Sequence, residues 1–176
     1  MSNSQFKKFL KKSYAAYALP RSRGKLNHLY AVYEQSWVDF AEILWLESEK
    51  YATEQRQALI RVSHAIEALN KFLPHTVNRY EDVRFFPGLA QAEREIVSYD
   101  FDSFHDFGIH WSLLAQVLKK QDARKGMDPF AAEVLAEGIA QYAVLLMRLS
   151  GVHAANQDAE YVKPEHIRES VRQIQS

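Results

Sequence analysis

The chain of 176 residues contains no cysteine. Without thiols it can form no disulfide, no thiolate zinc site and no cysteine nucleophile. Glycine and proline are also scarce, with 6 and 5 residues, which favours long helices joined by short turns. No apolar run approaches the roughly 20 residues of a membrane-spanning helix, and the N-terminus lacks the apolar core of a signal peptide. These absences predict a soluble, cytoplasmic protein with no membrane span.

A net charge is absent as well, since 22 basic residues balance 22 acidic ones. This balance argues against a nucleic-acid partner, because a nucleic-acid-binding protein usually carries a basic excess. The charges are nevertheless uneven along the chain, and seven bases precede the first acid, Glu34. They are Lys7, Lys8, Lys11, Lys12, Arg21, Arg23 and Lys25. We therefore divide the chain into a basic N-terminal amphipathic helix with its linker, residues 1–25, and a helical bundle domain, residues 26–176.

Apolar residues recur at helical spacing along most of the chain, and no stretch alternates in the manner of a strand. This pattern predicts an all-α, single-domain bundle of six or seven helices around a central helix at 128–150. Asp128 is placed to cap that helix, Pro129 suits its first turn, and Gly151 suits its end. The other helices are expected at 3–19, 26–50, 53–73, 78–84, 89–98, 103–120 and from Pro164 onward. No internal repeat is apparent.

The leading functional hypothesis is a non-catalytic helical protein that acts through protein–protein binding or self-association. A basic first helix followed by an acidic second helix would let copies of the chain pair with each other or with a protein partner. Aromatic side chains that the apolar stripes do not need would add contact area. The candidate binding residues are Lys7, Lys8, Lys11, Lys12, Trp45, Phe85 and Phe86. The sequence requires no cofactor, and it favours a protein that is not an enzyme.

Two short motifs supply catalytic alternatives. Arg148 and His153, separated by four residues, resemble the ribonuclease motif of HEPN domains, which are also helical. The resemblance implies that Arg148 stabilises a phosphate and that His153 takes part in proton transfer. A polar stripe of the same helix, which contains Glu133, Glu137 and Gln141, also accommodates Arg148 as an exposed residue.

The doublet His105-Asp106 resembles that of HD-domain metal phosphohydrolases. The resemblance implies a metal site that His64 or His75 and Asp158 would complete. The helical periodicity instead predicts that His64 points outward, away from the apolar face of its helix. A carboxylate-bridged metal site is not expected, because the chain has no Glu-x-x-His. His166 is expected to be exposed or terminal, whereas His110 is expected in the core.

The last quarter of the chain resembles the end of some AAA+ lid domains and of histone-fold chains. The resemblance rests on a long helix, a polar loop and the segment Tyr161-Val162-Lys163-Pro164-Glu165-His166-Ile167. It implies a helix–loop–helix arrangement and its packing. The signatures of an ATPase are missing, and no activity is inferred from this resemblance.

Overall fold

The computed structural model describes residues 8, 26–73, 108–121 and 126–175 of the chain. These residues are predominantly helical, which confirms the all-α class, and they contain five helices and two very short strands. The helices are α2 (Leu26–Glu54), α3 (Val62–Phe72), α5 (Ile109–Lys120), α6 (Pro129–Asn156) and α7 (Pro164–Gln175). The strands are β1 (Leu59–Ile60) and β2 (Gly126–Met127). Most of the helix expected at 3–19 and the helices expected at 78–84 and 89–98 lie outside the described residues.

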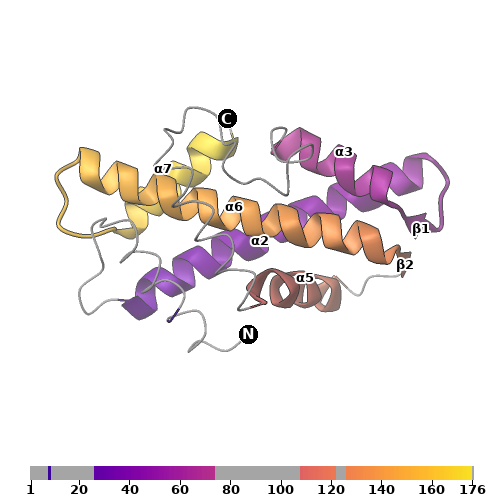
Figure 1. Cartoon of the computed structure of the whole chain (residues 1–176), viewed down its shortest axis with the longest axis horizontal. Coiled ribbons are helices and arrows are strands. Elements are labelled where there is room, and N and C mark those ends of the chain that lie inside the picture. Colours follow the sequence, from indigo (N-terminus) through magenta and orange to yellow (C-terminus); the bar gives the residue numbers. More distant parts are fainter. Residues whose placement is uncertain (1–7, 9–25, 74–107, 122–125, 176) are drawn as a thin grey trace.

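Two long helices, α2 and α6, cross each other near their midpoints and organise the fold (Figure 1). Each of them contacts the other and also contacts α3, α5 and α7. The sequence predicted one central helix at 128–150, but α6 shares that position with α2. The reason is that both helices are long and apolar on more than one side, so both need neighbours around them.

The start of α6 is the predicted one. Asp128 is the N-cap, its Oδ1 accepts the backbone N–H of Phe130 at 2.8 Å, and Pro129 follows in the first turn. The predicted end was wrong, because α6 continues past Gly151 to Asn156. Gly151 and Ala154 are both buried, so the last turn of this helix packs in the interior and is stabilised there.

The second long helix also differs from its expected bounds. Thr53 was expected to cap a new helix, but α2 continues through it to Glu54. Ala52 is fully buried, so the apolar face of α2 extends to its last turn. The chain then reverses at Arg56, which has a left-handed φ of 55°, and α3 begins at Val62.

The strands, which the sequence did not predict, join the loop before α3 to the segment before α6. β1 and β2 run parallel, with Leu59 opposite Gly126 and Ile60 opposite Met127. The backbone N–H of Asp128 donates to the Ile60 carbonyl at 2.8 Å. Two-residue strands are too short to carry an alternating pattern, which is why periodicity could not reveal them.

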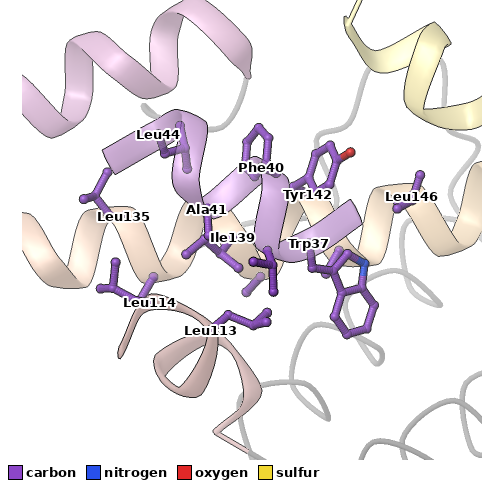
Figure 2. Close-up of a cluster of buried hydrophobic side chains, with 14 of the residues drawn as sticks. Trp37, Phe40, Ala41, Leu44, Leu113, Leu114, Leu135, Ile139, Tyr142 and Leu146 are labelled. Atoms are coloured by element: carbon purple, nitrogen blue, oxygen red, sulfur yellow. The ribbon is translucent and has the colours of Figure 1, made fainter. Parts of the chain in front are cut away.

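The core fills the crossing of α2 and α6 and the space between these helices and α5 (Figure 2). Its largest fully buried side chains in α2 are the aromatic Trp37 and Tyr33, while α6 contributes mainly aliphatic residues such as Ile139 and Leu146. Leu113 of α5 closes this cluster. Burying large side chains of this kind is the main favourable term in folding.

By length and composition, α6 could cross a membrane, and among the described residues it is the one helix that could. Within the protein, 67% of its most apolar window is buried against other helices. The core helix of a soluble protein has the same properties, so this feature is weak evidence for a membrane span.

Candidate functional site

The loop of residues 55–61, which joins α2 to α3, is closed by a buried histidine. His64 is 1% exposed, and its Nδ1 accepts the backbone N–H of Arg61 at 2.9 Å. Its Nε2 lies 2.9 Å from Oε1 of Gln55, nine residues earlier in the chain. A backbone N–H can only donate, so Nδ1 carries no proton and Nε2 is the donor to Gln55. We call this arrangement a Gln–His bridge.

The loop of residues 157–163, which joins α6 to α7, contains a second Gln–His bridge. His166 is also 1% exposed, and its Nδ1 accepts the backbone N–H of Lys163 at 2.9 Å. Its Nε2 lies 3.0 Å from Oε1 of Gln157, again nine residues earlier. Burial lowers the pKa of His166, Glu165 opposes that shift, and the charges of Lys163 and His153 add to it.

The two loops match in backbone conformation as well as in side chains. Each turns through a non-glycine residue of left-handed conformation, Arg56 with φ 55° and Asp158 with φ 52°. Every equivalent pair is separated by 102 positions (166 − 64). We call residues 26–73 the first unit and residues 128–175 the second unit. The expectation that the chain has no internal repeat was therefore wrong.

Equivalent residues inside the two long helices make the same contact. Ser48 Oγ donates to the Leu44 carbonyl at 2.8 Å, and Ser150 Oγ donates to the Leu146 carbonyl at 2.7 Å. All four residues are buried. Both the residue types and the hydrogen bonds are kept at the same spacing, so the likeness of the two units extends beyond the loops.

The two units meet at an aromatic pair. The rings of Phe40 and Tyr142 stack with centroids 3.9 Å apart and planes 7° apart, and Figure 2 shows them side by side at the helix crossing. These residues occupy equivalent positions of the two units, so an approximate twofold axis passes between their rings. Burial raises the pKa of Tyr142, and the negative charge of Asp39 raises it further.

The bridges change the interpretation of the histidines. His64 was expected to point outward, which is wrong because it is buried, and His166 is buried too, although it lies, as expected, in the last helix of the chain. Each stands in the first turn of a helix, where its ring reaches back to a backbone N–H that the helix itself leaves without a partner. Helical periodicity ignores such backward contacts. His110 is buried, as predicted, at 4% exposure.

The proposed ribonuclease pair lies on one continuous helix. Because α6 extends to Asn156, Arg148 and His153 are five residues apart and point about 140° away from each other. Arg148 is half-buried, and His153 Nε2 lies 2.9 Å from Gln173 Oε1 on α7. The structure thus directs the two side chains to different sides of α6.

The first unit has a comparable contact between its two helices near the positions equivalent to Arg148 and His153. Leu46 stands in place of Arg148 and Tyr51 in place of His153. Next to Tyr51, the Nζ atom of Lys71 on α3 lies 2.9 Å from Glu47 on α2. His153–Gln173 and Glu47–Lys71 therefore both tether the closing helix of a unit to its long helix.

The other predicted site residues fall into two groups. Trp45 was proposed for a contact surface but is 3% exposed, because its ring is part of the core. Lys8 is helical and exposed. Residues outside the described part of the chain are Lys7, Lys11, Lys12, Phe85, Phe86, His105 and Asp106.

No group of three or more metal-ligating side chains occurs within the described ranges. Asp158, which the HD-domain resemblance offered as a ligand, lies in the turn that leads to the second bridge. His64, another ligand offered by that resemblance, has both ring nitrogens in use in the first bridge. A metal at His64 would have to break the first bridge.

One exposed site was missed by the sequence analysis. Phe130 is 67% exposed and is the most exposed large apolar residue among those described. The backbone N–H of Asp128 binds the Ile60 carbonyl, which brings the start of α6 next to the loop that contains the exposed Arg61. Arg56, also exposed, is in the same loop. We call Arg56, Arg61 and Phe130 the junction surface, because their segments flank the paired strands β1 and β2.

Comparisons with known proteins do not assign this site. No protein-family model and no curated protein matches the chain.

Proposed function

We propose that this is a non-catalytic, cytoplasmic helical protein that acts by binding another protein or a second copy of itself. The architecture that supports this is a pair of similar helical units folded onto each other within one chain. The long helix, loop and helix that in the last quarter of the sequence resemble AAA+ lid domains and histone-fold chains also occur at residues 26–73. This is an analogy of fold, and the function must rest on a surface.

The observation that carries the proposal is the junction surface. Phe130 exposes 67% of its surface, and a partner that covered it would remove this apolar area from water. Two exposed arginines lie in the neighbouring loop. Phenylalanine and arginine are both enriched in the contact area of protein–protein interfaces. The basic lysines at 7, 8, 11 and 12 remain a second proposed contact.

The buried polar side chains also support a non-catalytic role. His64 and His166 each use both ring nitrogens to close a loop, and Ser48 and Ser150 bind their own helices. Catalysis needs such groups to face a substrate. In the described residues these groups instead hold the fold together.

The experiment measures association with the junction surface intact and altered. Static light scattering and cross-linking mass spectrometry of the full chain should detect a dimer or a partner whose cross-links map to the junction surface. Phe130→Ser should weaken that association at least tenfold, since exposed aromatic residues in interfaces often contribute more than about 1.4 kcal/mol. The fold should be kept because the residue is exposed.

Leu46→Ser is the matched control, because Leu46 is also an exposed apolar residue, at 45%, but belongs to the middle of α2. It should leave association unchanged. The proposal is wrong if the chain stays monomeric without a partner, or if both variants act alike. Cleavage of RNA or phosphoesters that Arg148→Ala with His153→Ala abolishes would favour the catalytic alternative instead.

A further inference from the structure

Each unit contains one buried imidazole whose neutral form is required by the backbone. Nδ1 of His64 faces the N–H of Arg61, and Nδ1 of His166 faces the N–H of Lys163, both at 2.9 Å. A protonated imidazole carries hydrogens on both nitrogens and accepts no hydrogen bond. Protonation would therefore place two N–H groups against each other and break the contact.

We propose that the two Gln–His bridges are acid-sensitive latches, which close the loops 55–61 and 157–163 at neutral pH and release them when His64 and His166 take up a proton. Release would free the first turns of α3 and α7, whose backbone N–H groups the imidazoles satisfy. It would also loosen β1, which follows Gln55 in the first loop and joins β2.

The two Gln–His bridges share the features that disfavour a proton on the ring. Both rings are 1% exposed, so a proton on either ring would be buried with little water to solvate it. Both bridges end on a glutamine, a neutral residue that offers no negative charge to stabilise an imidazolium. A carboxylate in that position would have the opposite effect.

The charged groups near the His166 ring act in opposite directions. Glu165 favours the protonated form, whereas Lys163 and His153 disfavour it. Burial, the largest effect, also disfavours it. In the first unit, the backbone N–H of Arg61 occupies the acceptor Nδ1 of His64 in the same way.

The direction of the pH effect follows from proton binding. In the unfolded chain an imidazole has a pKa of about 6.5. Burial holds the pKa of His166 below its ordinary value, so the unfolded state binds more protons as the pH falls through this range. The contribution of neutral His166 to the free energy of unfolding is therefore fully present above about pH 6.5 and decreases as the pH falls below that value.

The test compares wild type with His64→Gln, His166→Gln and the double variant by thermal unfolding of the full chain between about pH 7.5 and about pH 5.5. Glutamine at this helical position can accept the same backbone N–H but does not titrate. We expect the melting temperature of wild type to fall by on the order of 3–6 °C more than that of the double variant. Each single variant should remove about half of this difference.

Identical pH dependence in wild type and the double variant would overturn the proposal. If the double variant does not fold, nitrogen NMR of the wild-type imidazoles decides the question. Both rings should be the Nε2–H tautomer at about pH 7.5 and should protonate together with the loss of loop protection from hydrogen exchange. Rings that are protonated on Nδ1 at neutral pH, or loops that stay protected after protonation, would show that no latch exists.

Discussion

The first and second units share their polar contacts but differ in their core. Both have a Gln–His bridge, a left-handed turn and a buried serine bound to its own helix. The interior of α2 is aromatic, whereas that of α6 is aliphatic and small. Tyr33 corresponds to Leu135, and Trp37 corresponds to Ile139. Specific hydrogen bonds fix the form of each unit, while the packing only has to fill the space between them.

This difference in the size of the core side chains also explains why the first and second units are not interchangeable. A pair of units with aromatic residues in both long helices would overfill the crossing, and a pair with small residues in both would leave cavities. Large side chains on α2 instead meet smaller ones on α6. Each unit is therefore suited to the other and less suited to a copy of itself.

The largest expected effect comes from removing the stacked rings of Phe40 and Tyr142, which lie on the approximate twofold axis. Phe40→Ala or Tyr142→Ala should each lower the free energy of unfolding by about 3–5 kcal/mol, because each leaves a cavity at the helix crossing. Chemical denaturation with a double-mutant cycle should give a coupling of about 0.5–1.5 kcal/mol for the stacked rings. Trp111→Ala, at a residue 43% exposed, is the control and should cost much less. Independent effects of Phe40 and Tyr142 would contradict the stacked geometry.

A smaller expected effect tests how closely α3 packs against α6. A Cβ atom at Gly138 would clash with a methyl carbon of Leu69 on α3. Gly138→Val should therefore destabilise the fold by about 1–3 kcal/mol through overpacking, since Leu69 has to move. The measurement is urea unfolding.

The control for this prediction is the equivalent position in the first unit. Ser36 is half-buried, and its Oγ donates to the Val32 carbonyl of its own helix. Ser36→Ala should change stability by no more than about 0.5 kcal/mol. If Gly138→Val is equally harmless, the close approach of α3 to α6 is not as described.

The sequence allowed the all-α class and the start of α6 to be predicted, because Asp128 and Pro129 act locally. The end of α6 could not be predicted, since Gly151 is stabilised in the helix by tertiary burial that a local pattern does not contain. The repeat was missed because the core residues of the two units differ. Comparing the spacing of Gln55 with His64 and of Gln157 with His166 would have revealed it.

The candidate site was less predictable than the fold. Trp45 was chosen because it lies at the edge of the apolar stripe of α2, but a helix contacted by four others has almost no free edge. Phe130 was overlooked because exposure depends on what covers a residue and not on its own type. The ribonuclease and HD-domain pairs stay predictions that spacing alone suggested.

The smallest expected effect is a difference in stability between variants at Ser48 and Ser150, the equivalent buried serines of the two units. Ser48 binds only the Leu44 carbonyl among the hydrogen bonds described for it, and Ser48→Ala should be within about 0.5 kcal/mol of wild type because that carbonyl also serves the helix. Ser150 has a further contact, since its Oγ lies 3.3 Å from Ser170 Oγ on α7. Each serine has one hydroxyl proton, which the Ser150–Ser170 contact shares with the Leu146 and His166 carbonyls, and Ser150→Ala should cost about 0.5–1.5 kcal/mol.

Precise urea titrations of both serine variants and of Ser170→Ala measure this difference. The variants Ser150→Ala and Ser170→Ala should cost the same, and their combination should cost no more than either alone, because they remove one shared bond. In the first unit Ala68 stands where Ser170 stands in the second, so no such bond can form there. Equal effects of Ser48→Ala and Ser150→Ala would mean that the additional bond contributes nothing, and that α7 is held to α6 by its apolar residues and by His153–Gln173 alone.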